Sequence, residues 1–468
     1  MSNIKKDIVV IGGGPAGYIG AIKAARLGAS VLLAEKKQVG GTCLNIGCIP
    51  TKYFVQSVHT ISALRNGVSR GIEITDPSFT IDMKKAVKGK DKTVKRLVKG
   101  VEFLLNQAKV ETVNQKATII GKNLVKLEDG TVIETKNILI ASGSVSATVP
   151  IEGLDSPFVV DSEKILDLEY LPKKLAIIGG GVIGVEFASI FSSFGSEVTV
   201  IEALPSLLNG FDEEQVEVLS KGLKKNKVTV YTSTTVTKIE THTDEATLSL
   251  SNGKSLNSDL ILLAVKRKAN LSPLTDEFKI KTDKNRLVIN EYGVTSVDNI
   301  YGGGDVTGLN MLAHVAYHMG EAVAHNICVD LGLLKTPKQK IRLDIVPSVV
   351  YSDLEIASVG MTEKEAAATK KYDIVVGKFP LSANGRSLSA DFSEGFVKVV
   401  SERKYGQILG VFCAGLNVSE IIGEAVVAMQ HELTVYEIAD SIHAHPTINE
   451  ALKEAAAICI GQCYHWGS

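Results

Sequence analysis

Two cysteines stand five positions apart in this chain, with glycines before and between them and a proline shortly after. Thiols as close as Cys43 and Cys48 can open and close as a disulfide without moving the rest of the chain. Free cysteine is also among the most buried residue types, so the pair alone fits two packed side chains equally well. The chain has only six cysteines, too few for a secreted disulfide scaffold, which favours a reducing compartment.

A second candidate group lies near the end of the chain, where His443 and His445 precede Pro446 and Glu450. Two histidines two positions apart could ligate a metal from a strand, but no third ligand has suitable spacing, so we expect no metal site. His445, with Glu450 on the following turn, is instead typical of a histidine oriented by a carboxylate, which can move protons near neutral pH. An ordinary helix-capping region is the alternative if no thiol chemistry occurs.

Two glycine-rich turns predict the elements that would position these groups. Each follows a short apolar strand and precedes a helical pattern, a second apolar strand and an acid. The first copy comprises strand 8–11, Gly12, Gly14, Gly17, strand 31–34 and Glu35. The second comprises strand 176–178, Gly179, Gly181, Gly184, strand 198–201 and Glu202. The offset from Gly12 to Gly179 equals that from Glu35 to Glu202.

This unit has the properties of a dinucleotide site. Its glycines allow a tight turn and close approach of a pyrophosphate, which faces the helix N-terminus, while the acid binds a ribose hydroxyl. Two complete copies predict two dinucleotide sites; a single working site with a decayed copy is disfavoured because both copies keep the acid. Since Glu202 has no basic neighbour in the sequence, NAD is preferred over NADP.

Further patterns complete the outline of the fold. A lysine-rich helix over 84–99 should present a solvated face. Strand 138–141 leads into Ser142 and Gly143, alternating residues from 236 to 250 predict a small β-meander, and 259–264 is a further strand. A glycine loop ends at Asp305, and a helix is predicted from Met311 to Leu331. After Pro337, strands and helices alternate as in an α+β unit.

Length and charge restrict the class of protein. A chain of 468 residues is too long for one core and should contain about three domains. The formal net charge of -1 gives no reason to expect nucleic acid or an anionic membrane as a partner. No apolar run reaches the ~18 residues of a membrane-spanning helix. We therefore expect a soluble, cytoplasmic protein.

Taken in order, these motifs resemble the pyridine nucleotide–disulfide oxidoreductases. The match covers the whole chain and includes Gly-Gly-Thr-Cys-x4-Cys-x-Pro-x-Lys at 40–52 and His-x-His-Pro-Thr-x-x-Glu at 443–450. The resemblance implies an α/β protein with two Rossmann-like dinucleotide-binding domains, for FAD and NAD, followed by an α+β dimerisation domain. Its implied limits are 1–149 for the first part of the FAD domain, 150–275 for the NAD domain, 276–338 for the second part of the FAD domain, and 339–468 for the dimerisation domain.

The resemblance also implies roles for individual residues. Lys52 and Glu186 would pair beside the flavin, and His445 would act in the active site of the other subunit of a homodimer. The FAD contacts would be Gly12, Gly14, Gly17, Glu35, Gly41, Thr42, Lys52, Ser142, Gly143, Asp305, Met311, Leu312, Ala313 and His314. The NAD contacts would be Gly179, Gly181, Gly184 and Glu202.

Within the family, the pattern is most similar to members that oxidise dihydrolipoyl groups of a 2-oxo acid dehydrogenase or glycine cleavage complex. His445, oriented by Glu450, would deprotonate a dihydrolipoyl thiol, which attacks Cys43 and leaves Cys48 as a thiolate against the flavin; NAD is the final acceptor. One alternative is an NAD(P)H-dependent reductase of another small disulfide. Another is a non-catalytic component of a multienzyme complex that keeps FAD only for folding.

Residues 266, 303 and 317–319 depart from the family pattern, with Gly303 in the place of a usual apolar residue. Lys266 replaces a usual glycine beside the expected adenosine pocket, which bears on NAD affinity and on the choice between NAD and NADP. The segment 317–319 replaces a usual acidic run. Cys459 and Cys463 lie in an apolar helix and a final strand-like run over 455–466, where we expect packing residues.

Overall fold

The first glycine turn lies at the centre of a mostly parallel sheet in the computed structural model, which describes residues 4–72 and 79–467. The strands of this sheet are β1 (Ile4–Ile11), β2 (Val31–Ala34), β3 (Glu111–Val113), β4 (Ala117–Gly121), β5 (Leu124–Leu127), β6 (Val132–Ile140) and β19 (Ile300–Gly302). Their order is β3-β2-β1-β6-β5-β4, with β19 also pairing with β6. The strands β3, β2, β1, β6 and β19 are parallel, whereas β4 and β5 form an antiparallel extension. The apolar runs of β1 and β2 are buried on both faces, as expected of central parallel strands.

Helices surround this sheet and carry the two cysteines. They are α1 (Pro15–Arg26), α2 (Gly41–Ile46), α3 (Cys48–Asn66), α4 (Met83–Gln107) and α7 (Ala313–Asp330). Pro15 opens α1, where its fixed φ suits a helix start. A Cβ on Gly17 would lie 1.8 Å from the carbonyl oxygen of Gly12, so only glycine lets the helix approach the turn this closely. Gly320 serves α7 in the same way, because a Cβ there would lie 2.4 Å from the oxygen of Ala16.

A second, wholly parallel sheet contains the second glycine turn. Its strands are β8 (Val159–Asp161), β9 (Lys174–Ile178), β10 (Glu197–Ile201), β11 (Thr229–Tyr231) and β15 (Leu260–Leu263), in the order β11-β10-β9-β15-β8. The helices are α5 (Val182–Phe194) and α6 (Glu213–Lys225). A Cβ on Gly184 would lie 1.9 Å from the oxygen of Gly179, which repeats the close approach of the first turn. The predicted meander is present as β12 (Val236–Thr241), β13 (Ala246–Leu250) and β14 (Ser255–Ser258).

The chain enters and leaves this second unit at one place. Strands β7 (Ser144–Ser146) and β16 (Arg267–Ala269) form a two-stranded antiparallel ribbon between the two parallel sheets. The domain limits 149/150 and 275/276 lie near this ribbon and stay predictions. The remaining short elements here are β17 (Thr282–Asp283), β18 (Arg286–Leu287), and the 3-10 turns η1 (Val68–Arg70), η2 (Lys164–Asp167) and η3 (Gly304–Thr307).

The last part of the chain forms a five-stranded antiparallel sheet covered by helices. The strands are β20 (Ser348–Val350), β21 (Glu355–Gly360), β22 (Ile374–Pro380), β23 (Phe396–Glu402) and β24 (Ile408–Gly415), in the order β20-β21-β24-β23-β22. The helical elements are α8 (Glu363–Ala368), η4 (Leu381–Ala383), α9 (Gly385–Ser389), α10 (Val418–Gln430), α11 (Val435–Asp440) and α12 (Glu450–Cys459). This arrangement confirms the predicted α+β unit.

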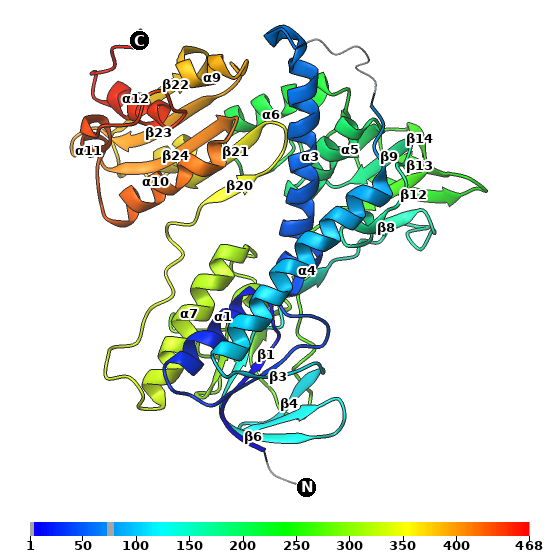
Figure 1. Cartoon of the computed structure of the whole chain (residues 1–468), viewed down its shortest axis with the longest axis vertical. Helices are drawn as coiled ribbons and strands as arrows, with labels where there is room; N and C mark the ends of the chain where they lie inside the picture. The colour runs from blue at the N-terminus through cyan, green and yellow to red at the C-terminus, as the bar shows by residue number, and fades with distance from the viewer. Residues whose placement is uncertain (1–3, 73–78, 468) are drawn as a thin grey trace.

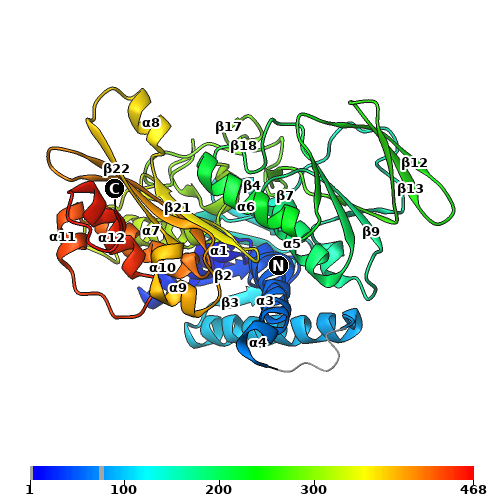
Figure 2. The ribbon, with the colours of Figure 1, turned by 90° about the horizontal axis from the view of Figure 1, so that it is seen from above.

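Three lobes result (Figure 1): the sheet around β1 at the bottom, β8 to β14 at the right, and β20 to β24 at the upper left, with α3 and α4 between them. Seen from above, α3 and α4 lie together on one side (Figure 2). The predicted fold class, two Rossmann-like dinucleotide-binding units followed by an α+β unit, is confirmed. Among residues 4–72 and 79–467, no helix has the length and apolar content needed to cross a membrane.

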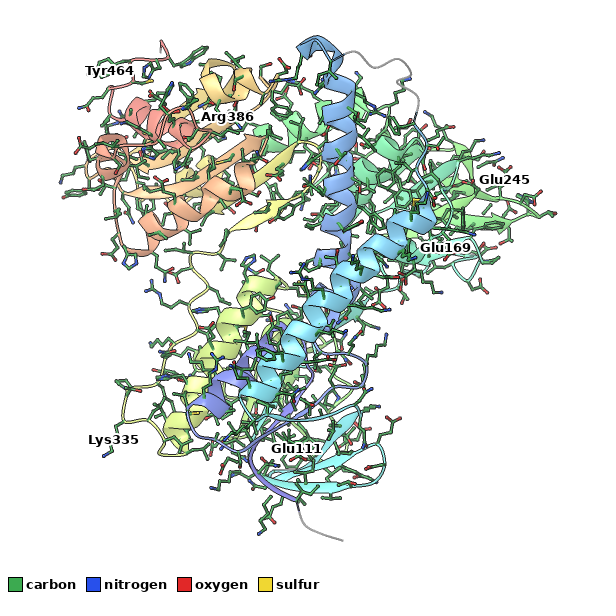
Figure 3. All side chains as sticks on the ribbon, in the orientation of Figure 1. Glu111, Glu169, Glu245, Lys335, Arg386 and Tyr464 are labelled. Carbon is green, nitrogen blue, oxygen red and sulfur yellow. The ribbon has the colours of Figure 1, made fainter. Side chains whose placement is uncertain are left out.

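Several predicted elements differ from the structure. The helix expected from Met311 begins at Ala313, because Leu312 has extended angles (φ -119°, ψ 141°). His443 and His445 lie in an irregular segment before α12. Helix α12 ends at Cys459, and no strand follows it within the described tail, where Tyr464 projects from the edge of the third lobe (Figure 3). The lysine-rich helix is solvated as predicted, except that Lys90 is buried against Asp91 and Asp167.

Candidate redox site

The two cysteines lie on consecutive helices that meet at a single glycine. Cys43 is in α2 and Cys48 is the first residue of α3, with Gly47 between the helices. A Cβ on Gly47 would lie 2.9 Å from the oxygen of Thr42, so glycine permits this tight junction. Both cysteine side chains are half-buried.

The two sulfurs are not equivalent. A hydrogen bond between the thiols raises the pKa of Cys43 and lowers the pKa of Cys48. Burial raises the pKa of Cys48, whereas the positive charge of Lys52, one turn later on α3, lowers it further. Cys48 also opens a helix, where backbone N–H groups favour a thiolate. The inner sulfur is therefore the one stabilised as an anion.

Lys52 pairs with Glu186, as the resemblance implied. Its Nζ lies 2.8 Å from both carboxylate oxygens, although Lys52 is on α3 and Glu186 is on α5 of the second sheet. The Glu186 side chain is only 5% exposed. A second donor group, the backbone N–H of Tyr351, makes a third hydrogen bond to the carboxylate, at 3.0 Å from Glu186 Oε1. The sequence did not predict this contact, because Tyr351 belongs to no motif.

The first glycine turn is fitted for a dinucleotide. Glu35 follows β2, and its carboxylate accepts hydrogen bonds from the N–H groups of Gly13 (2.7 Å) and Lys37 (2.8 Å). Helix α1 has neither a side-chain cap nor an acidic residue in its first turn, so its N-terminal N–H groups suit a pyrophosphate. Gly41 touches this turn, because a Cβ there would lie 2.6 Å from Gly14 Cα, and this places Thr42 at the same end of α1.

Asp305 follows β19, which lies on the other flank of β1 from β2, and the three strands are parallel. Asp305 is in η3 and accepts a 2.6 Å hydrogen bond from Ser144 Oγ, while Arg267 Nε donates to that Oγ over 2.8 Å. Burial raises the pKa of Asp305. The predicted residue Ser142 donates to the backbone oxygen of Asn270 (2.7 Å). Ser144 and Arg267 were missed as site residues; they belong to the β7–β16 ribbon, which only the fold brings together.

The N-terminus of α7 completes this region. Met311 and Leu312 form an extended approach to the helix, and Ala313 and His314 are its first residues. Helix α7 again lacks a side-chain cap and an acid in its first turn. Burial lowers the pKa of His314, whose Nε2 lies 2.9 Å from the oxygen of Pro347. These uncapped helix ends and glycine-lined turns fit FAD.

The second glycine turn repeats this geometry. Glu202 accepts hydrogen bonds from the N–H groups of Gly180 (2.6 Å) and Leu204 (2.7 Å), and α5, which starts after Gly181, is uncapped. These features fit NAD in the same way. The exposed Lys266 follows β15 beside this turn, where a Cβ on Gly179 would lie 2.5 Å from the oxygen of Ala264.

His445 and Glu450 form the predicted pair. His445 Nδ1 lies 2.9 Å from Glu450 Oε1, and the N–H of Thr447 donates to Glu450 Oε2 over 2.7 Å. Burial would raise the pKa of Glu450, but these two hydrogen bonds hold it below its usual range. His445 is 79% exposed, and its side-chain hydrogen bond is to Glu450 rather than to Cys43 or Cys48. Within one chain, the structure does not bring His445 to the thiols.

Comparison with known proteins covers most of the chain. A family model described as pyridine nucleotide-disulphide oxidoreductase matches residues 6–320, and the dimerisation domain of that family matches 346–456. Dihydrolipoyl dehydrogenase of Bacillus subtilis is 36% identical over 465 residues, 98% of this chain and 99% of that protein. Leghemoglobin reductase of Vigna unguiculata is 37% identical over 97% of this chain and 87% of its own. Among solved structures, the HOCl-induced flavoprotein disulfide reductase RclA of Escherichia coli has a TM-score of 0.86 and 28% identity, covering 97% of this chain and 99% of its own.

Proposed function

Because the chain belongs to the pyridine nucleotide–disulphide oxidoreductase family, we propose that it oxidises the dihydrolipoyl groups of a multienzyme complex with NAD as the acceptor. FAD and NAD are the cofactors of this family. When bound, FAD supplies the electron acceptor beside the thiols and the hydride donor to NAD. The relatives named dihydrolipoyl dehydrogenase support the lipoyl substrate, and the matched dimerisation domain supports a homodimer.

In the proposed reaction, the chain's own residues carry the thiol chemistry. His445 of one subunit takes the proton of a dihydrolipoyl thiol, and Glu450 stabilises the resulting imidazolium. The substrate thiolate attacks Cys43 Sγ and breaks the Cys43–Cys48 disulfide, which leaves Cys48 as a thiolate beside Lys52. The second substrate thiol then attacks the substrate sulfur of the mixed disulfide, which closes the lipoyl disulfide and breaks the bond to Cys43. Cys43 leaves as a thiol with the proton that His445 took first, and His445 holds the proton of the second substrate thiol.

The observation that carries this proposal is the hydrogen-bonded His445–Glu450 pair, in which His445 is exposed on the dimerisation lobe. The same chain has two thiols whose pKa values are shifted in opposite directions. A base that must remove two protons per turnover suits oxidation of a dithiol. The intact set Cys43, Cys48, Lys52, His445 and Glu450 disfavours a component that keeps FAD only for folding.

The test is an anaerobic assay of the purified holoenzyme with dihydrolipoamide and NAD. We expect NADH formation, and a long-wavelength thiolate–flavin absorbance when dihydrolipoamide is added without NAD. Absence of both would contradict the lipoyl substrate. The Glu202 carboxylate at the second glycine turn suits a free ribose hydroxyl and not a 2′-phosphate. NADP should therefore be used at least about 10-fold less efficiently than NAD, equivalent to ~1.4 kcal/mol. Equal rates would contradict the assignment of Glu202.

A second candidate is an NAD(P)H-dependent reductase of another small disulfide. It is favoured by Lys266 beside the second glycine turn and by the likeness to RclA, a flavoprotein disulfide reductase. The same holoenzyme would then consume NADH or NADPH with a disulfide other than lipoamide and give no NADH from dihydrolipoamide. The complex that is served is identified by assaying lipoyl domains of 2-oxo acid dehydrogenase and glycine cleavage complexes side by side.

A further inference from the structure

The segment that follows β20 connects the third lobe to the helices of the redox site. Asp353 Oδ1 accepts a hydrogen bond from Ser62 Oγ (2.7 Å), and its N–H donates to Ser189 Oγ (3.2 Å). The backbone oxygen of Ser352 lies 3.2 Å from His59 Nε2. These partners lie on α3 and α5, so this segment of the third lobe is bonded to both helices.

Tyr351, the first residue of this segment, contacts both members of the Lys52–Glu186 pair. Lys52 Nζ lies 4.5 Å from the centroid of the Tyr351 ring, and the Tyr351 N–H donates to Glu186 Oε1 over 3.0 Å. The ammonium therefore has the carboxylate as one partner and the ring face as another. An ammonium at this distance from an aromatic face is attracted by the quadrupole of the ring.

The contacts of Tyr351 bear on the redox chemistry because the Lys52–Glu186 pair lies next to Cys48. Glu186 is buried, and a buried carboxylate needs several hydrogen-bond donors in place of the water it has lost. The four-carbon stem of Lys52 is flexible, so it needs contacts on more than one side to hold a single position. Lys52 is one helical turn after Cys48, which brings its charge to the inner sulfur.

We propose that Tyr351 is a positioning residue of the redox site: its ring contacts Lys52, its backbone N–H holds the Glu186 carboxylate that anchors Lys52, and together they keep the Lys52 ammonium where it stabilises the Cys48 thiolate. This inference rests on the proposed function, in which Cys43 and Cys48 are the redox pair beside FAD. It couples the docking of the third lobe to the chemistry of the thiols. The three residues come from three separate parts of the sequence.

The test measures the thiolate directly in the FAD-loaded protein. The holoenzyme is reduced anaerobically with one equivalent of dithionite, which requires no lipoyl substrate, and the long-wavelength thiolate–flavin absorbance is titrated with pH. The variants are Tyr351→Leu, Tyr351→Phe, and replacement of Tyr351 by pentafluorophenylalanine, which keeps the ring but reverses its quadrupole. Tyr405→Leu is the matched control, because it removes an exposed lysine–tyrosine contact of similar length (4.7 Å) in the same lobe.

Without the ring, Lys52 is held less firmly and the thiolate is less stable, so the midpoint of the absorbance should move to higher pH. We expect a rise of about one pH unit for the leucine and pentafluoro variants, and much less for phenylalanine. Tyr405→Leu should leave the midpoint unchanged. If Tyr351→Leu does not fold, the comparison of the two phenylalanine rings carries the test.

The outcomes separate this inference from the proposed function. If the wild-type protein gives no thiolate–flavin absorbance after dithionite reduction, the redox assignment itself is wrong. If the wild-type absorbance is present but its midpoint is the same in the pentafluoro and phenylalanine variants, Tyr351 does not position Lys52. A lower melting temperature with an unmoved midpoint would likewise reduce Tyr351 to a packing residue and overturn the inference.

Discussion

At the scale of single residues, Cys43 and Cys48 differ in what surrounds each sulfur, and this difference predicts different mutant spectra. Cys48 is the sulfur next to Lys52 and the start of α3, so it should be the thiolate that contacts the flavin. Replacing Cys48 with serine should abolish the thiolate–flavin absorbance. Cys43→Ser, the matched control, should show the absorbance without any reductant, since it leaves Cys48 unable to form the disulfide. A surviving absorbance in the Cys48 variant would reverse the two roles.

Glu450 is a second residue whose surroundings predict a measurable effect. The hydrogen bonds from Thr447 and His445 keep its pKa low, so it remains a carboxylate throughout the range in which histidine titrates. Glu450→Gln keeps the shape but removes the charge that stabilises a protonated His445. We expect kcat with dihydrolipoamide to fall by about 100-fold, within the range for general base catalysis. The thiolate–flavin absorbance after dithionite reduction should be unchanged; its loss would mean that Glu450 supports the fold instead.

At the scale of elements, helix α6 of the second lobe is joined to β23 of the third by a buried ion pair. Lys398 Nζ lies 2.7 Å from Asp212, the N-cap residue of α6, and both side chains are less than 10% exposed. Burial would lower the pKa of Lys398, but Asp212 and Glu214 raise it above the ordinary 10.5. The pair therefore stabilises the fold below that pH and is lost as pH rises through the higher, folded-state pKa.

The Lys398→Met variant tests this connection. Methionine keeps most of the volume but leaves Asp212 buried without its partner, which should destabilise the fold by about 3–5 kcal/mol at neutral pH. Lys364→Met is the control, because Lys364 of α8 also forms an ion pair with α6, through Glu213, but both of these side chains are exposed. Its loss should lower the free energy of unfolding by less than about 1 kcal/mol. Urea unfolding of both variants gives the comparison. If both variants lost the same free energy of unfolding, the buried Lys398–Asp212 pair would stabilise the contact of α6 with β23 no more than an exposed pair does.

Elements with a strong local signal were predictable from the sequence, and those fixed by distant packing were not. The two glycine turns and their flanking strands have all their determinants within about 30 residues, a βαβ unit, so both were found. Burial of Lys90 depends on Asp167, which lies beyond the helix that the lysine pattern describes. Likewise, nothing near Ser144 indicates that Arg267 will pair with it across the β7–β16 ribbon. The same holds for the site. The Lys52–Glu186 pair was predicted from the family resemblance, whereas the contacts of Tyr351 with that pair depend on the fold and were not predicted.

At the scale of the whole molecule, the position of His445 in a separate lobe predicts how the active site is assembled. Within one chain, His445 is exposed and bonds to Glu450, not to Cys43 or Cys48. In a two-fold symmetric dimer, each surface patch meets its counterpart, so two identical composite sites would form. Each site would then use the thiols of one subunit and the histidine of the other. A single chain would contain all the residues but no complete site.

Hybrid dimers test this assembly. Cys43→Ser and His445→Gln homodimers should each be almost inactive with dihydrolipoamide. When the two chains are co-expressed with different tags and the doubly tagged dimer is purified, one site combines both substitutions and the other has neither. That hybrid should show about half of the wild-type activity per dimer, since one of its two symmetric sites is intact. If His445 instead acted on the thiols of its own chain, each site would contain one substitution and the hybrid would be as inactive as its parents.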